Sequence, residues 1–472
     1  MVFLYFYPMR ILCIVLILVS GTLKAQLPID SVATLIKNAY RQTYSEEMAY
    51  QWLTTLCKDI GHRLSGSPQA EQAVQWGKKT MDTFRLDQVY LQPVMVTHWL
   101  RGEKEQVVMK SKGTGKVELK ALALGNSIGT GPDGVSGDVI EVHSIDELKE
   151  LPDDQIKNKI VFFNRPMDKG LTNTFAAYGG AADQRYSGPK EAAIKGAKAV
   201  VIRSLCSATD DHPHTGSCFY ADTIRNIPAV ALSTKDADLL TQAVRAGKTE
   251  LFIRTTCQML PDVQSYNVIG EIKGSEHPEQ YIIVGGHLDS WDVGDGAHDD
   301  GAGCVQSMEV LYRLKKMGYQ PKHTIRCVLF MNEENGLKGA REYARVAQEQ
   351  SEYHVAAIES DAGGGPAQSF GCSAGEGVVL DDRLKYLDTY INTLLGPYDL
   401  ELKPGGGGAD IGPLKPNAGL MIGLRPESAR YFEYHHAETD VLENVHPREL
   451  ASGSAALISL VLVLDQYGIG DE

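Results

Sequence analysis

Residues 281–303 read YIIVGGHLDSWDVGDGAHDDGAG, and this stretch joins a strand to a helix. The apolar run Tyr281–Val284 ends in two glycines and His287, a pattern typical of a buried strand. Five carboxylates and two histidines lie in the fourteen residues up to Asp300, and a helical pattern begins at Ala302. In open α/β sheets, ligands bind at this edge, beyond the carboxyl ends of the strands. Because buried carboxylates without a partner are costly, so dense a cluster predicts a bound cation.

Three more apolar strands farther along the chain also lead into acidic residues or histidines. These are Thr324–Met331 before Glu333 and Glu334, Val355–Ile358 before Glu359 and Asp361, and Gly419–Leu424 before His435, His436 and Asp440. Strands that alternate with helices predict an α/β fold with a mostly parallel mixed sheet and helices on both faces. Since parallel strands end at the same edge of a sheet, the four groups are expected to converge.

Imidazoles combined with carboxylates form a ligand set that suits zinc, and less selectively manganese or cobalt. Asp289 lies two residues beyond His287, on the same face of an extended chain, and could hydrogen-bond the far nitrogen of that ring. Asp440 could do the same for His436. Asp299 opens the helix and could bridge two metal ions.

The adjacent acids Glu333 and Glu334 could divide two tasks, one as a ligand and the other as general base for a metal-bound water. Taken alone, such a pair is more often solvated surface, and Asp299 could be only a helix cap. His435 is interpreted as a packing residue rather than a ligand. The coincidence of suitable residues at four strand ends favours the metal site over these separate explanations.

Length and charge restrict the class of protein. The chain has 472 residues, which favours two domains. Its net charge of −14 argues against nucleic acid or an anionic membrane surface as partner. Residues 1–25 have the features of a signal peptide, with Arg10 ahead of the apolar run Ile11–Val19, which is too short to span a bilayer. We therefore expect an exported protein, periplasmic or extracellular, without a membrane span.

Seven cysteines remain after the signal peptide, an odd and low number that excludes a disulfide-rich scaffold. Cys206 and Cys218 flank a loop that contains His212 and His214. A disulfide between these cysteines is the favoured interpretation for an exported protein, while two free thiols or a second zinc site remain open.

The pattern of elements changes between residues 102 and 261, where short strands and small helices occur without clustered acids. This region is predicted to be an inserted domain. Residues 26–101 and 262–472 would then form the domain that carries the acidic strand ends.

Several motifs of this sequence resemble the di-zinc exopeptidases, a family that includes bacterial leucyl aminopeptidases and glutamate carboxypeptidases. They are HLDSWDVGDGAHDDGAG, NEENG, ESDAGG and YFEYHHAETD, together with the GHRLSGS and IPAVALS segments. The chain is most similar to the plasma glutamate carboxypeptidase branch, and the likeness covers nearly all of the mature chain. The segment LRPESARY, residues 424–431, departs from the acidic loop expected in the animal relatives, which leaves the side-chain preference open.

The resemblance implies a phosphorylase-like zinc-exopeptidase fold, two Zn²⁺ ions per chain, a protease-associated-like insertion over the site, and a homodimer. It implies His287 and Asp361 as ligands of one zinc ion, Glu334 and His436 as ligands of the other, and Asp299 as the bridge. It further implies Glu333 as general base, Asp289 as the residue that orients His287, and a cis peptide bond between Asp299 and Asp300.

Together these features predict a secreted zinc exopeptidase that cleaves dipeptides or short peptides with a metal-bridging water activated by Glu333. A carboxylate terminus of the substrate could be held by Arg425 or by the backbone around Gly407 and Gly408. Aminopeptidase, carboxypeptidase and dipeptidase action remain open. The alternatives are a zinc deacylase on the same fold and an inactive binding relative, although the complete ligand set disfavours the latter.

Overall fold

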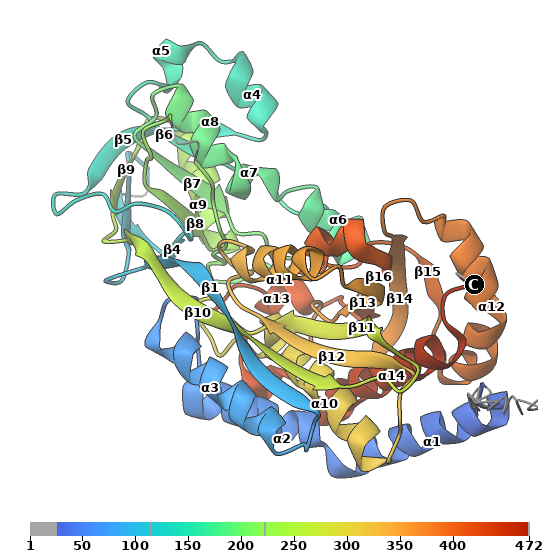
Figure 1. The fold of residues 1–472 in the computed structure, drawn as a ribbon. Coiled ribbons are helices and arrows are strands. Elements are labelled where there is room, and N and C mark those ends of the chain that lie inside the picture. The colour runs from blue at the N-terminus through green and yellow to red at the C-terminus, as the bar shows by residue number, and fades with distance from the viewer. Residues whose placement is uncertain (1–25, 114, 221–222, 471–472) are drawn as a thin grey trace, which may run out of the picture.

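The computed structural model describes residues 26–113, 115–220 and 223–470, so the predicted signal peptide lies outside the described residues. Within these ranges the chain forms two eight-stranded sheets, each covered by helices (Figure 1). The predicted α/β class is confirmed.

The first sheet has the strand order β1-β10-β12-β11-β13-β16-β14-β15. Its four central strands β12, β11, β13 and β16 are mutually parallel, whereas β10 and β14 run antiparallel to their neighbours β12 and β16. The strands span β1 Gln88–Leu100, β10 Gln258–Ile272, β11 His277–His287, β12 His323–Phe330, β13 Tyr353–Glu359, β14 Ala367–Ala374, β15 Leu402–Pro404 and β16 Ala418–Pro426. The carboxyl ends of the four parallel strands therefore meet at one edge, as predicted from the alternation of strands and helices.

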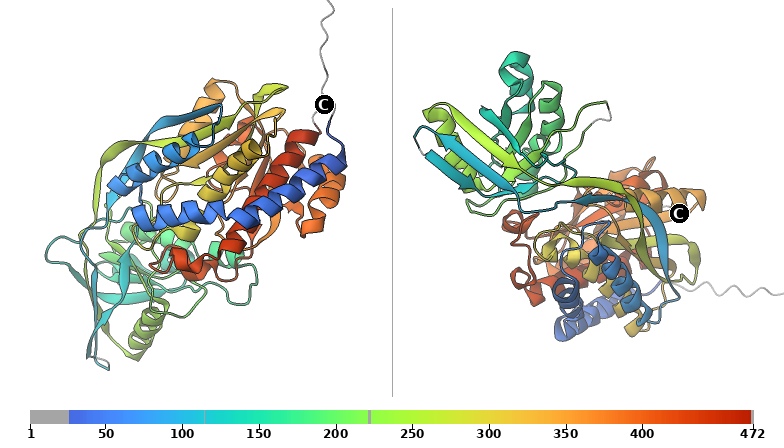
Figure 2. Two further views of the ribbon diagram at one scale, coloured as in Figure 1. Left: turned by 90° about the horizontal axis from the view of Figure 1, so that it is seen from below. Right: turned by 90° about the vertical axis from the view of Figure 1, so that its left-hand side faces the viewer.

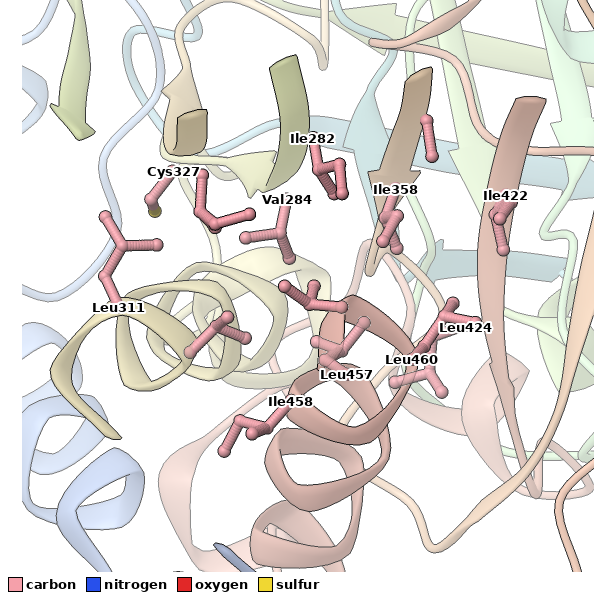
Figure 3. Close-up of a cluster of buried hydrophobic side chains, with 14 of the residues drawn as sticks. Ile282, Val284, Leu311, Cys327, Ile358, Ile422, Leu424, Leu457, Ile458 and Leu460 are labelled. Carbon is pink, nitrogen blue, oxygen red and sulfur yellow. The ribbon is translucent and has the colours of Figure 1, made fainter. Parts of the chain in front are cut away.

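Helices cover both faces of this sheet (Figures 1 and 2). One face carries α1 Ile29–Glu46, α2 Met48–Thr55, α3 Pro68–Asp82, α10 Ala302–Lys316 and α14 Pro447–Tyr467, and the opposite face carries α11 Lys338–Glu349. Helix α12, Leu380–Leu394, packs beside α1 and α14. Figure 3 shows the apolar layer under the central strands, in which Val284, Ile358 and Ile422 face Leu457 and Leu460 of α14. These strand residues are fully buried, which anchors the site edge to a rigid core.

Helix α14 is the one helix among the described residues that is long and apolar enough to cross a membrane, with a mean hydropathy of 1.5. Inside the fold, however, 94% of its apolar window is buried against the sheet and α10. It is a core helix of the first sheet's domain.

The second sheet lies between β1 and β10 in the chain and has the order β3-β2-β9-β5-β6-β7-β8-β4. Its strands span β2 Gln106–Ser111, β3 Gly115–Leu119, β4 Ala121–Ala123, β5 Val135–Val142, β6 Ile160–Phe163, β7 Ala199–Arg203, β8 Ala229–Leu232 and β9 Thr249–Arg254. Strands β3 and β4 lie at opposite ends of this order, yet only Lys120 separates them. Since one intervening residue lets the two strand ends lie at most about 7 Å apart, the sheet must curl until its two edges approach each other there, like a barrel.

Small helices surround the second sheet, and some of them extend toward the first (Figure 1). They are α4 Ile145–Glu150, α5 Asp153–Ile156, α6 Thr174–Gly179, α7 Asp183–Tyr186, α8 Gly188–Ile194 and α9 Thr234–Ala246. Helix α6 packs against α13, Tyr431–Tyr434, where the Phe175 ring stacks on Tyr431 at 5.4 Å and Tyr178 stacks on Phe432 at 4.7 Å. The second sheet is thereby fixed over the carboxyl edge of the first.

The structure differs from the sequence-based elements at two places. The predicted domain boundary at Pro261 falls inside β10, because pairing of Leu100 with Gln258 extends that strand toward the second sheet. Strand β14 was not predicted, since its sequence, AQSFGCSA, lacks the β-branched residues that signal a strand. Pairing with β16 and β15 supplies the stability that local propensity does not.

Candidate metal centre

All five predicted ligands lie together at the carboxyl edge of the first sheet, although they come from different strands. His287 ends β11, Glu334 follows β12, Asp361 follows β13, and Asp299 and His436 lie in the turns before α10 and after α13. His287, Asp299 and Glu334 are buried, the His436 side chain is 9% exposed, and the Asp361 side chain is partly exposed, at 23%.

Asp299 stands between the two histidines and offers one carboxylate oxygen to each. Its Oδ1 lies 3.1 Å from Nε2 of His287, and its Oδ2 lies 3.1 Å from Nε2 of His436. Asp361 approaches the same His287 nitrogen at 3.6 Å, and Glu334 approaches the His436 nitrogen at 3.2 Å. The arrangement consists of two ligand groups that share one carboxylate, each with one imidazole and one further acid.

The electrostatics of this cluster fit divalent cations. No lysine or arginine in the described residues forms an ion pair with Asp299, Glu334 or Asp361, whose partners are all histidines. Oε1 of Glu334 is buried without a hydrogen-bond partner. Burial raises the pKa of Glu334 well above its usual range, and the neighbouring Asp299 adds to this shift. Buried carboxylates without cations are unfavourable, so oxygen and imidazole donors in this pattern fit zinc.

Glu333 lies beside the ligand groups, forms no ion pair with another described residue, and lines the cavity described below. Burial raises the pKa of its carboxyl well above the usual range; the neighbouring His287 opposes this shift, and Asp361 and Glu334 add to it. A carboxyl group with a raised pKa can hold a proton near neutral pH, as a general base must do between two proton transfers.

Two supporting acids act through contacts other than those predicted. The backbone carbonyl of Asp289, not its carboxylate, lies 2.9 Å from Nδ1 of His287. Its carboxylate Oδ1 instead accepts the amides of Asn332 and Glu333, at 2.7 and 3.0 Å. Asp289 therefore positions the histidine with its main chain and the Glu333 segment with its side chain.

The expected contact between Asp440 and His436 is likewise wrong. Asp440 accepts the amides of His298 and Asp299 through its two oxygens, at 2.7 and 3.1 Å. It thus holds the backbone that carries the shared ligand. The peptide bond between Asp299 and Asp300 is cis, as the resemblance implied.

Arg63, from the GHRLSGS segment, fixes the loop between His287 and Asp299. It is fully buried, and its guanidinium donates to the carbonyls of Leu288, Asp295 and Gly296 at 2.6, 2.8 and 2.9 Å. These bonds join the two ends of the loop, so the spacing of two predicted ligands depends on one side chain.

A cavity of about 300 Å³ opens onto the cluster, and both sheets contribute to its wall. Asp299, Glu333, Glu334, Asp361 and His436 line its floor. Its opposite wall includes Phe175, Tyr178, Arg185, Ser217 and Phe219, which belong to the second sheet's region.

Sequence reasoning missed the contribution of Tyr178 and Arg185 to this wall. Arg185 donates to the Tyr178 hydroxyl at 2.6 Å, and its Nη1 lies 3.4 Å from Nδ1 of His436. Both residues lie in short helices that carry no acid or histidine cluster, so composition gave no signal. Only the folding of the second sheet onto the first brings them to the site.

The residues predicted to hold a substrate carboxylate do not line this cavity. Arg425, in β16, donates to the carbonyls of Gly406 and Gly407 at 2.5 and 3.2 Å, so its guanidinium is used in holding the glycine-rich segment that follows β15. Gly408 packs against Glu359 so closely that a Cβ would lie 2.1 Å from that carboxylate. A role of Arg425, Gly407 and Gly408 in substrate binding stays a prediction.

The favoured disulfide between Cys206 and Cys218 is wrong for this structure, because both thiols are free and buried. Their sulfur atoms have separate partners. Cys206 Sγ lies 3.6 Å from Oδ2 of Asp210, whereas Cys218 Sγ lies 3.3 Å from the carbonyl of Gly125.

Comparison with known proteins agrees with this geometry. The model of peptidase family M28 matches residues 267–461, the segment that carries all five predicted ligands. Carboxypeptidase Q of Bos taurus is 32% identical over 91% of this chain and 88% of its own length, and that of Homo sapiens is 33% identical over the same shares. The chain belongs to peptidase family M28.

Solved structures extend the likeness to the whole M28 fold. A peptidase M28 precursor from Shewanella amazonensis has a TM-score of 0.86 and 29% identity, covering 93% of this chain and 97% of that one. A zinc aminopeptidase from Bacillus subtilis has a TM-score of 0.64 at 21% identity, covering 90% and 97%, a likeness of fold. Family membership confirms the predicted recognition and the predicted enzyme class, a metallo-exopeptidase.

Proposed function

We propose that this M28 peptidase removes terminal residues from dipeptides or short peptides with two zinc ions held at the carboxyl edge of the first sheet. The observation that carries the proposal is Asp299, whose two oxygens each face a histidine at 3.1 Å. His287 and Asp361 would hold one ion and Glu334 and His436 the other, with Asp299 between them. When bound, such ions polarise a scissile carbonyl and lower the pKa of water toward neutrality.

The chain's own residues would supply proton transfer and positioning. Glu333 would take a proton from the attacking water and return it to the leaving amine. Asp289 would hold the Glu333 backbone and His287 at the same time, through the two contacts measured above. Arg63 and Asp440 would keep Asp299 at its distance from both histidines.

The cavity supports a preference for short substrates. Its volume of about 300 Å³ is at the lower end of the range for small-molecule sites, roughly 300–1,000 Å³. The aromatic contacts between α6 and α13 close one side of it. The region 102–261 would therefore act as a protease-associated-like lid that excludes long chains.

The proposal predicts about two zinc ions per chain at this centre in purified, unchelated protein. Asp361→Asn should weaken retention of one ion, because it removes a charge from only one of the two ligand groups. Metal analysis of the dialysed proteins measures this, with Asp381→Asn on the exposed start of α12 as control. A folded wild-type chain that retains almost no metal would contradict the proposal.

The dependence of kcat/KM on substrate length tests whether the second sheet restricts access to the site. Dipeptides should be cleaved with a higher kcat/KM than long unstructured peptides that share the same terminal residues, because the wall from the second sheet leaves little room. Blocking either the amino or the carboxyl terminus of each dipeptide then distinguishes aminopeptidase from carboxypeptidase action. Equal kcat/KM for short and long substrates would show that the lid does not restrict access.

Two further expectations complete the proposed function. Export would remove residues 1–25, so mass spectrometry of the secreted protein should give a chain beginning near Gln26. A homodimer is expected from the resemblance, and sedimentation would reveal its mass. Recovery of the uncleaved chain would refute the expected removal of residues 1–25. A monomer at the protein concentrations used in the activity assays would refute the expected homodimer.

A further inference from the structure

A second cluster of potential metal ligands lies in the loop between β7 and β8, outside the centre described above. Cys206, Asp210 and His214 each place one donor atom within 4.8 Å of the others. Cys206 and His214 are 4% and 1% exposed, and Asp210 is half-buried. The donor set consists of a thiolate, a carboxylate and an imidazole, all of which bind zinc in proteins.

The imidazole of His214 has the hydrogen-bonding pattern of a metal-binding histidine. Its Nδ1 lies 2.6 Å from the carbonyl of His435, a contact in which the ring must donate. The other nitrogen, Nε2, then carries a lone pair, and it is buried without a hydrogen-bond partner. A carbonyl that fixes the tautomer of a ligating histidine is the usual supporting contact in metal sites. Without an ion, this buried lone pair would be an uncompensated cost.

Backbone amides hold the other two donors in place. Asp210 accepts the amide of His212 through Oδ1 at 3.1 Å, which leaves Oδ2 directed at Cys206. Cys206 Sγ accepts the amide of Ala208 at 3.3 Å. The three donors are therefore held near one another before any ion binds, and Cys206 Sγ and Asp210 Oδ2 keep lone pairs for ligation.

We propose that Cys206, Asp210 and His214 bind one further Zn²⁺-class cation, with the fourth position left to solvent. The ion would join the β7–β8 loop to the His435–His436 loop through the His214 contact, and so fasten the second sheet to the wall of the cavity. The inference stands apart from the proposed function, since none of its ligands belongs to the Asp299 centre.

Cobalt substitution tests this site separately, because the ligands proposed for the Asp299 centre contain no sulfur. Reduced full-length protein loaded with Co²⁺ should show thiolate-to-cobalt charge-transfer absorption in the near ultraviolet. Cys206→Ala should lose this band and one metal ion per chain. Cys218→Ala, a matched change of another buried cysteine in the same region, should retain both.

Further variants keep the test decisive if Cys206→Ala folds poorly. Asp210→Asn preserves the oxygen that accepts the His212 amide, and it should lower the affinity for Co²⁺ by about tenfold or more. Glu334→Gln should deplete the Asp299 centre yet leave the thiolate band, so failure of one site is distinguishable from failure of the other. A wild-type protein without the band, or a band that persists in Cys206→Ala, would overturn the proposal.

Discussion

Replacing Glu333 by glutamine is expected to lower kcat by a factor of about 10²–10⁴, the usual contribution of a general base. Glutamine has nearly the same shape but cannot accept a proton from water. Because Glu333 pairs with none of the predicted ligands, its loss should leave the metal content close to that of the wild type. Steady-state kinetics on a dipeptide, together with metal analysis of the same sample, measure both effects.

Glu334→Gln is the matched control, one residue away and of the same chemistry. It should lose metal, because Glu334 lies 3.2 Å from the imidazole of His436 within the second ligand group. Added zinc should partly restore activity in Glu334→Gln but not in Glu333→Gln. Near-normal turnover in Glu333→Gln would refute the assignment of the base.

Replacing Arg63 by methionine should have the largest effect on stability. Methionine fills part of the space but leaves the carbonyls of Leu288, Asp295 and Gly296 without their donor. Each buried carbonyl left unpaired costs about 1–3 kcal/mol, so a total loss of about 3 kcal/mol or more is expected. The apparent Tm should fall by about 3 °C or more, with weaker metal retention.

Thermal unfolding of the metal-loaded and chelated proteins separates the two consequences of Arg63→Met. If the loop is the part affected, zinc should protect the variant less than the wild type. Arg345→Met removes an exposed arginine that pairs only with Glu342 and Glu349 of its own helix, and should change stability by no more than about 0.5 kcal/mol. Equal Tm values for Arg63→Met and the wild type would show that the loop does not depend on this side chain.

The chemistry of three predicted ligands, His287, Glu334 and Asp361, could be read from the sequence because each one ends or closely follows a strongly apolar strand. The ends of β11, β12 and β13 are unambiguous, since runs such as TIRCVLFM cannot be anything but buried. Parallel pairing then places His287, Glu334 and Asp361 at one edge without further information. Local pattern and topology agree here, so the sequence sufficed.

Contacts that depend on side-chain direction could not be predicted in this way. The positions of Asp289 and Asp440 near their histidines were evident from spacing, but each carboxylate turns to backbone amides that only the folded loop presents. The residues of the cavity wall could not be predicted from the sequence for another reason. Tyr178 and Arg185 are far from the ligands in sequence, and their place depends on how two sheets pack, which no local pattern encodes.

The pairing of Leu100 with Gln258 means that the chain leaves the first sheet and returns to it at neighbouring points, about 5 Å apart. Strands β1 and β10 thus form an antiparallel hairpin of the first sheet, and the entire second sheet is inserted in the loop of that hairpin. The entropy of closing a loop grows only slowly with its length, so related chains could lengthen, trim or exchange the barrel at little cost to the register of β1 and β10. Evolution could thus alter the wall of the cavity while the strand order that positions the predicted ligands stays the same.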